Sequence, residues 1–230
     1  MNLTAVTATC DRPEAFMLCQ IWMSRQGKAP MQWIVLDDGL RPARCVLGQE
    51  YMHFAGWRGH WSLSQKISHL CSSGMVKGDA VVFFEDDDWY APGWLEFCDR
   101  ELEHYAMVGE GNAIYYNVTY RRWFGHGNMG HASLCSTAIR KTELPALQEQ
   151  CKDPNPFVDS RMWDRMQCSK RVFNNEPHSL VVGIKGMPGT PGYGHGHGPH
   201  DPSSKDDYDL TVLKSLVGED YKVYATFWNL

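Results

Sequence analysis

The chain has 230 residues, a length that suits one domain or one domain with an appendage. Its residues are 43% hydrophobic and 21% charged, so it can build a substantial core, and its formal net charge is -5. This charge excludes a general attraction to nucleic acid, which would need a local basic patch instead.

The apolar runs and the cysteines bear on the compartment. No run is long enough to cross a bilayer, and the first residues lack the charged and apolar regions of a signal peptide. We therefore expect a cytoplasmic protein. The 8 cysteines are widely spaced and form no CxxC pair, which argues against a zinc ribbon and for free thiols in or near the core.

Predicted strands and helices alternate in the first half of the chain. Apolar runs predict strands at 3–8, 32–36 and 80–84. Helices are predicted at 13–26, 62–75 and 92–107, and prolines begin the first and the third of them. This order predicts an α/β protein with a mostly parallel sheet flanked by helices.

The second half of the chain predicts a mixed-sheet extension. Strands are expected at 113–120, 131–139, 180–184 and 222–227. Helices are expected at 141–150, 157–168 and 206–217. The segment 183–200 is rich in glycine and proline and is predicted to be largely loop.

The predicted strands of the first half all end in acidic residues. Asp11-Arg12 follows the first strand, Asp37-Asp38 the second, and the run Glu85 to Asp88 the third. In parallel sheets, ligands bind beyond the carboxyl ends of the strands. The sequence therefore predicts a binding site at this edge.

Four consecutive carboxylates repel one another unless a cation lies between them. Mg²⁺ and Mn²⁺ bind through one or two carboxylates together with the phosphates of a substrate. Because the run Glu85 to Asp88 follows a buried apolar strand directly, it predicts a metal–diphosphate site. The alternative is a solvated acidic turn.

The segment DAVVFFEDDDWYAPGWLE resembles the strand and DxD motif of family 2 GT-A glycosyltransferases. The resemblance implies a Rossmann-like GT-A fold with Mn²⁺ or Mg²⁺ as cofactor. It implies Asp87 as the main metal ligand and Glu85 or Asp86 near the donor ribose. Glu85 stands where the family has its first Asp, which leaves the division of roles between these acids open.

Two earlier segments support the same resemblance. LTAVTATCDRPEAF is similar to the first strand of the family, which implies that Thr9, Asp11 and Arg12 border the nucleotide. QWIVLDDGL is similar to the V-D-D-G-S segment, which implies that Asp37 or Asp38 contacts the base or the ribose.

The segment PFVDSRMWDRM resembles the E-D-x-x-L-W-x-R start of a helix in the family, although Val158 replaces the usual Glu. The resemblance implies Asp159 as the general base. A sugar hydroxyl is a poor nucleophile until a carboxylate takes its proton, so the chemistry suits that role. The alternative is an Asp that only caps its helix.

The glycine-rich segment near residue 190 supplies the remaining candidates. Relatives of this type carry a histidine that completes the metal shell, and the resemblance places it at His197, with His195 as the competitor. Lys185 could neutralise the diphosphate or be an ordinary surface lysine. The histidines could also belong to an incidental loop or form a zinc site of their own.

The resemblance spans roughly residues 3 to 200 and implies two halves of one GT-A domain. Residues 1–110 would bind the nucleotide sugar, with UDP the usual nucleotide, and residues 111–230 would bind the acceptor and catalyse transfer with inversion. Small viral glycosyltransferases that decorate DNA offer an analogy, and a viral chain would act in the host cytoplasm.

The acceptor is either a glycan or protein, or a 5-hydroxymethylated base in DNA. An aromatic-basic stretch could contact sugars, bases or phosphates, or be partly core; its members are Tyr115, Tyr116, Tyr120, Arg121, Arg122, Trp123 and Phe124. Further basic residues are expected on the helix after Asp159, at Arg161, Arg165, Lys170 and Arg171.

Two rival functions stay open. A nucleotidyltransferase also uses paired acids and a metal, but it releases pyrophosphate. A non-catalytic metal-binding or carbohydrate-binding module would bind without turnover.

Overall fold

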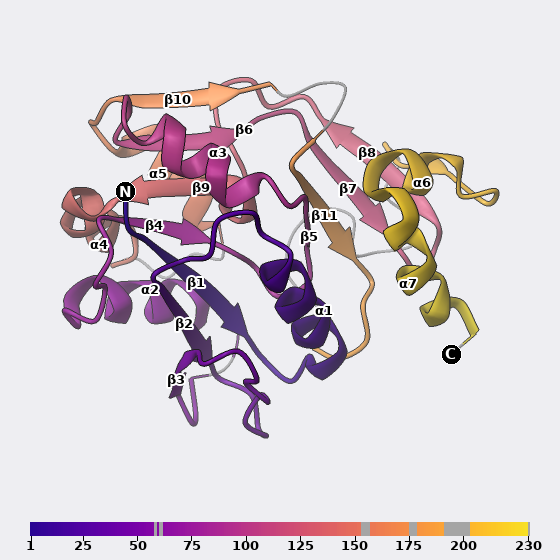
Figure 1. Cartoon of the computed structure of the whole chain (residues 1–230), viewed down its shortest axis with the longest axis horizontal. Helices are drawn as coiled ribbons and strands as arrows, with labels where there is room; N and C mark the ends of the chain where they lie inside the picture. The colour runs from indigo at the N-terminus through magenta and orange to yellow at the C-terminus, as the bar shows by residue number, and fades with distance from the viewer. Residues whose placement is uncertain (58, 60–61, 153–156, 175–178, 191–202, 230) are drawn as a thin grey trace.

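The computed structural model describes residues 1–57, 59, 62–152, 157–174, 179–190 and 203–229, and it shows a mixed α/β protein with two sheets (Figure 1). The first sheet has seven strands in the order β10-β6-β9-β4-β1-β2-β3. Their bounds are β1 (Leu3–Thr9), β2 (Gln32–Asp37), β3 (Glu50–His53), β4 (Ala80–Phe83), β6 (Met107–Glu110), β9 (Thr137–Arg140) and β10 (Lys170–Phe173). Only the pairs made by β9 are antiparallel, so the predicted mostly parallel sheet is confirmed.

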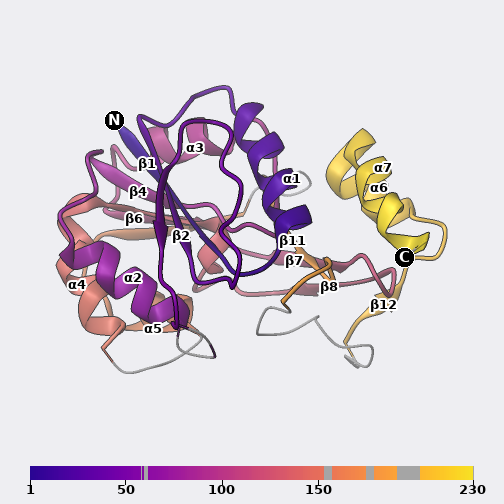
Figure 2. The same ribbon diagram turned by 90° about the horizontal axis from the view of Figure 1, so that it is seen from below.

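Helices cover both faces of the first sheet (Figure 2). One face carries α1 (Pro13–Ser24) and α3 (Trp94–Glu101). The other carries α2 (Ser62–Ser72), α4 (Leu144–Gln150) and α5 (Val158–Arg165). Successive strand residues alternate between the two resulting cores, as Val81 and Val82 of β4 do. Because β4 is buried on both faces, its sequence is apolar throughout.

The second sheet has the strand order β12-β8-β7-β11-β5 and mixes parallel and antiparallel pairs. Its strands are β5 (Trp89–Tyr90), β7 (Ala113–Asn117), β8 (Arg122–His126), β11 (Val181–Lys185) and β12 (Lys205–Asp206). The chain leaves the first sheet after β4 and enters the second at β5 only a few residues later. The acidic run Glu85 to Asp88 therefore lies where the two sheets meet.

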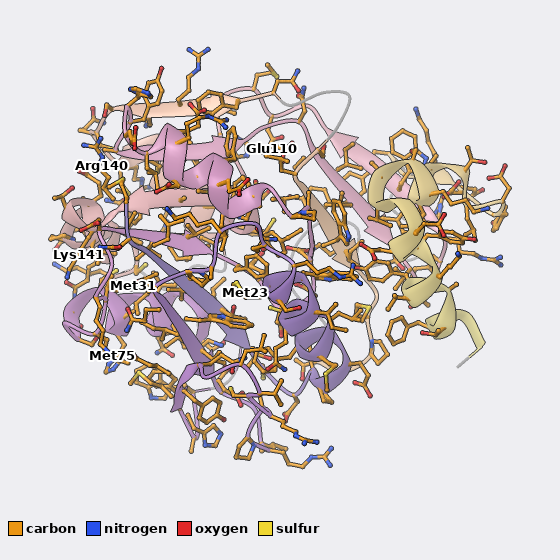
Figure 3. The ribbon with its side chains drawn as sticks, viewed as in Figure 1. Met23, Met31, Met75, Glu110, Arg140 and Lys141 are labelled. Carbon is orange, nitrogen blue, oxygen red and sulfur yellow. The ribbon has the colours of Figure 1, made fainter. Side chains whose placement is uncertain are left out.

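Hydrogen bonds to Glu110 join the second sheet to the first. This residue is buried at the end of β6 and accepts the backbone N–H groups of Leu180 and Val181, at 2.9 and 3.0 Å to Oε2. Figure 3 shows Glu110 and Arg140 toward opposite ends of the neighbouring strands β6 and β9. Glu110 thus fixes the position at which β11 begins. That position lies at the edge of the first sheet where its parallel strands have their carboxyl ends.

The last helices lie against α1 and β5. They are α6 (Thr211–Val217) and α7 (Tyr221–Ala225), followed by a 3₁₀-helix at Thr226–Asn229. Asp220 accepts the indole N–H of Trp89 at 2.9 Å and pairs with Arg25 at 2.6 Å. The predicted strand at 222–227 is therefore wrong. Leu213, Val217 and Tyr224 are buried at helical spacings.

Several other predicted boundaries were wrong. The helix expected at 92–107 ends at Glu101, and β6 follows it. The strand expected at 131–139 begins only at Thr137, after a 3₁₀ turn at Leu134–Ser136. The helix expected at 157–168 ends at Arg165, and β10 follows it. In the described part of the chain, no helix is long and apolar enough to span a membrane.

Candidate functional site

The strand order of the first sheet reverses between β1 and β4. From β1 the chain proceeds to β2 and then β3 on one side, whereas β4 lies on the other side. A crevice at such a switch point is the usual ligand site of an open α/β sheet. The segments that follow β1 and β4 meet here, because the Arg12 guanidinium bridges Asp86 at 2.9 Å and Asp87 at 2.8 Å.

Glu85 and Asp88 have a different neighbour from Asp86 and Asp87. Potential metal-ligand atoms of Glu85, Asp88 and Cys135 all lie within 4.8 Å of one another, a group that could hold a metal ion. Cys135 precedes β9, which pairs with β4. The sequence predicted Cys135 only as a thiol in or near the core. Its place beside Glu85 and Asp88 depends on the pairing of β9 with β4, which joins segments more than 50 residues apart.

Lys185, at the end of β11, is the second cation of the cluster. Its Nζ lies 3.3 Å from Asp88 and 3.9 Å from Asp87, and 5.5 Å from the ring centroid of Tyr115. The side chain is buried. Although burial opposes its charge, Asp87 and Asp88 raise the pKa of Lys185 well above its ordinary value, so it stays a cation. The surface-lysine alternative is therefore wrong.

The cluster holds more negative than positive charge. Among the described residues, Arg12 and Lys185 are the cations that pair with Asp86, Asp87 and Asp88, so four carboxylates and two cations give these six groups a formal charge of -2 when all are ionised. Burial raises the pKa of Glu85 and of Asp88, and it raises that of Asp86 to about 6. Oδ2 of Asp86 and of Asp88 are buried, and the hydroxyl of Thr9 and the thiol of Cys135 are the side-chain hydrogen-bonding neighbours of these two carboxylates. A divalent cation fits such a site by charge and by donor type.

Asp159 lies in the first turn of α5, near the cluster. Burial raises the pKa of its carboxyl group, and its charge contributes to the raised pKa of Glu85. The N-cap of α5 is Phe157, and Asp159 Oδ1 accepts the N–H of the adjacent Ser160 at 2.8 Å. Asp159 is therefore not the N-cap residue, but its carboxylate binds a backbone N–H at the start of the helix. A structural role at the helix start and the role as a base both stay open.

The acids at the end of β2 are held by the protein itself. The carboxylate of Asp37 accepts hydrogen bonds from Gly39 N at 2.7 Å, Ala43 N at 2.8 Å and the Tyr51 hydroxyl at 2.6 Å. Asp38 pairs with Lys66 at 2.6 Å, and both side chains are buried. The Lys66 ammonium also donates to the backbone carbonyl of Thr9, at 3.3 Å.

Asp11 shapes the same edge. Its Oδ1 accepts the N–H of Leu40 at 2.8 Å, which joins the loop after β1 to the loop after β2. Its φ of 47° is in the left-handed region, which Asp tolerates better than most residues. Thr9, Asp11 and Arg12 thus all lie at the switch point, and their contact with a nucleotide stays a prediction.

His197 and its competitor His195 lie outside the described residues. The described chain before them passes beside Arg12. A Cβ atom on Gly189 would lie 2.5 Å from the carbonyl oxygen of Asp11, and the φ of Gly189 is +110°. Glycine is required here for both reasons. Whether either histidine reaches the cluster stays a prediction.

Several basic residues of the second half are engaged within the protein, whereas Arg165 and Arg171 are exposed. Arg122 pairs with Asp206 at 2.8 Å, and the guanidinium of Arg121 lies over the ring of Tyr208. Lys170 and Arg171 belong to β10, so their predicted position on a helix was wrong. Lys170 donates to carbonyl oxygens at the end of α5.

Comparison of the sequence with protein-family models and with curated proteins gave no match. Among solved structures, the chain is similar to S. aureus TarS 1-349, with a TM-score of 0.55, 11% sequence identity and 80% of this chain covered. The same protein in complex with UDP-GlcNAc gives a TM-score of 0.52 at 10% identity, and in complex with UDP 0.54 at 9%.

The chain spans 60% of TarS 1-349 and 37% of the longer TarS structure. At this identity the likeness shows a shared fold. The predicted Rossmann-like architecture thus has a counterpart in a protein crystallised with a nucleotide sugar.

Proposed function

We propose that the chain is a GT-A glycosyltransferase that transfers a sugar from a UDP-sugar to an acceptor hydroxyl, using Mn²⁺ or Mg²⁺. The observation that carries the proposal is the group of four carboxylates at the switch point, bridged by Arg12 and with two charges in excess. The fold shared with TarS, which was crystallised with UDP-GlcNAc and with UDP, supports a donor of this class.

The proposed donor site runs along the ends of β1, β2 and β4. Thr9, Asp11 and Asp38 would border the base and ribose, with Glu85 or Asp86 at the ribose. Asp37 would act indirectly, by ordering the loop from Gly39 to Ala43 through the hydrogen bonds that it accepts.

The diphosphate would lie against the cationic side chains of the cluster. Asp87, on the side of Arg12, and His197 are the proposed metal ligands. When bound, the cation would supply positive charge to the departing nucleoside diphosphate. Arg12 and Lys185 would turn from the carboxylates toward the phosphate oxygens, because a guanidinium and an ammonium bind phosphate well.

Asp159 is the proposed general base. It would take the proton of the acceptor hydroxyl as that oxygen attacks the anomeric carbon and the bond to the diphosphate breaks. The result of this single displacement is inversion at that carbon. Burial raises the pKa of Asp159 toward the working pH, which favours proton transfer to it.

We propose an acceptor of the glycan or protein class over hydroxymethylated DNA. A DNA acceptor needs several cations that are available to phosphates. In the described chain, Arg122 pairs with Asp206, Arg121 lies over Tyr208, and Lys170 binds carbonyl oxygens. The aromatic stretch is also partly core, because Tyr116 and Phe124 are buried.

The first test is thermal unfolding with UDP, GDP or CMP, each in Mn²⁺ and in EDTA. A ligand present at about 100 times its Kd adds about 2.7 kcal/mol to stability. For a protein of this size that raises the midpoint by roughly 5–10 °C. We expect such a rise with UDP in Mn²⁺, and none in EDTA.

Asp87→Ala should abolish the rise, because it removes the proposed metal ligand. Asp79→Ala is the matched control, since Asp79 directly precedes β4, at the opposite end from the acidic run, and binds the N–H of Asn2. Asp79→Ala should keep the rise. No rise with any nucleotide in wild-type protein, with or without metal, would overturn the proposal.

Turnover separates the rival functions. A glycosyltransferase releases UDP from UDP-sugar, a nucleotidyltransferase releases pyrophosphate from a nucleoside triphosphate, and a binding module releases neither. Asp159→Asn should lower transfer by about 10²–10⁴-fold and leave the UDP-dependent rise in midpoint unchanged. Loss of the rise in this variant would place Asp159 in the donor site instead.

A further inference from the structure

The four acids after β4 divide into two pairs with different partners. Asp86 and Asp87 pair with Arg12. Glu85 and Asp88 instead lie with Cys135, with potential ligand atoms of the three within 4.8 Å of one another. In the proposed transfer Cys135 has no role, Asp88 pairs with Lys185, and Glu85 is one of the two acids proposed at the ribose.

Asp88 joins β11 to the Cys135 thiol, which is its side-chain hydrogen-bonding neighbour. Its Oδ1 accepts the N–H of Ile184 at 2.8 Å and faces Lys185 at 3.3 Å. Its Oδ2 is buried and accepts no N–H group of the described residues, and the whole residue is 1% exposed. A cation that takes the place of the thiol proton would bind the carboxylate and the sulfur together.

The chemistry of the three donors selects a kind of ion. Bonds of 2.0–2.3 Å place tetrahedral ligands roughly 3.5 Å apart, so modest side-chain rotations would close the group around Zn²⁺. A thiolate favours Zn²⁺ and other soft ions over Mg²⁺. Three protein ligands leave a fourth position open, as in exchangeable rather than closed zinc sites.

We propose that Glu85, Asp88 and Cys135 form a second cation site, separate from Asp87, that binds a thiophilic divalent ion such as Zn²⁺. On binding, the thiol proton leaves to solvent and Sγ takes its place on the ion.

The test is titration of the metal-free full chain with Co²⁺, which replaces Zn²⁺ and shows a thiolate-to-cobalt charge-transfer band in the near ultraviolet. We expect the band in wild-type protein and its loss in Cys135→Ser. The matched control is Cys98→Ser, because Cys98 is equally buried but belongs to α3, and this variant should keep the band. Zn²⁺ should abolish the band by competition, whereas Mg²⁺ should not.

Glu85→Gln keeps the thiol and should weaken Co²⁺ binding at least ten-fold. This second variant tests the site even if Cys135→Ser folds poorly. No band in wild-type protein, an unchanged band in Cys135→Ser, or unchanged affinity in Glu85→Gln would overturn the proposal. The Mn²⁺-dependent response to UDP should survive in Cys135→Ser; its loss would show one shared site and overturn the separation. Because Co²⁺ binding is measured without nucleotide, it can fail or succeed independently of the proposed transfer.

Discussion

The carboxylates after β2 and those after β4 sit at the same edge of one sheet, but the protein balances them differently. Asp37 receives three hydrogen bonds, and Asp38 forms a buried ion pair with Lys66. After β4, four carboxylates share Arg12 and Lys185. After β2 the charge of Asp38 is matched by Lys66, although Oδ2 of Asp38, like that of Asp86 and Asp88, is buried and accepts no N–H group of the described residues. After β4 the described carboxylates outnumber the described cations, so it is the balance of charge that differs between the two strand ends.

This difference separates acids that build a site from acids that bind its ligand. A buried carboxylate with its own counter-charge contributes to the native structure, and its partner's removal is costly. A buried carboxylate with too little counter-charge destabilises the empty protein and gains from a cation. Opposite effects of substitution on stability are therefore expected at the two strand ends.

The largest change in stability is expected at the end of β2, where Lys66→Met should lower the free energy of unfolding. Lys66 and Asp38 are 3% and 1% exposed, and breaking a buried ion pair by removing one partner costs about 3–5 kcal/mol. Denaturant unfolding should show a loss of this size. Mn²⁺ should not restore it, because the bare Asp38 lies outside the proposed metal ligands.

The double variant Lys66→Met with Asp38→Asn is the control for this prediction. It removes both charges and should recover most of the lost stability, with a coupling energy of the size seen for residues in contact. A loss of less than about 1 kcal/mol in Lys66→Met would mean that the pair behaves like an exposed one, and the contrast between the two strand ends would then weaken.

After β4, the substitution Asp86→Asn is expected to raise the free energy of unfolding instead of lowering it. Burial raises the pKa of Asp86 from 3.8 to about 6, so the folded protein favours the protonated form. The ionised carboxylate therefore destabilises the fold above pH 6, by at most about 3 kcal/mol at 1.36 kcal/mol per unit. Asp86→Asn should raise the free energy of unfolding at pH 7.5 by about 1–3 kcal/mol.

The pH dependence of this gain in stability tests whether burial of the Asp86 carboxylate causes it. As the pH falls through 6 toward 3.8, wild-type Asp86 becomes protonated in the folded and then in the unfolded state, so the advantage of Asp86→Asn should disappear. Asp79→Asn, at the exposed opposite end of β4, should show no such gain. A loss of stability in Asp86→Asn at pH 7.5 would show that its pairing with Arg12 outweighs burial.

The sequence could predict both strand ends but not this difference between them. Apolar runs followed by acids are local patterns, so β1, β2, β4 and the acidic residues after them were predictable. The partners come from elsewhere: Lys66 from α2, Tyr51 from β3, and Cys135 from the turn before β9. Those contacts depend on long-range strand pairing, which residue patterns do not specify.

The C-terminal segment shows a different limit of local patterns. Its aromatic and β-branched residues favour a strand, because such side chains suit a pleated surface. The segment forms α7 instead, because Tyr224 packs on Trp22 of α1 and Asp220 binds Trp89 of β5. Tertiary packing outweighs intrinsic propensity here, as it commonly does for short segments.

The smallest effect is expected in Tyr51→Phe, which tests whether Asp37 supports the loop or binds the donor. The Tyr51 hydroxyl donates to Asp37 at 2.6 Å, and two backbone N–H groups remain when it is lost. The cost should be about 1–2 kcal/mol of unfolding free energy, with the Mn²⁺-dependent response to UDP unchanged. Tyr208→Phe, at an exposed tyrosine, is the control and should cost nothing measurable. Loss of the UDP response in Tyr51→Phe would instead mean that Asp37 contacts the donor directly, and the acids after β2 would then belong with those after β4.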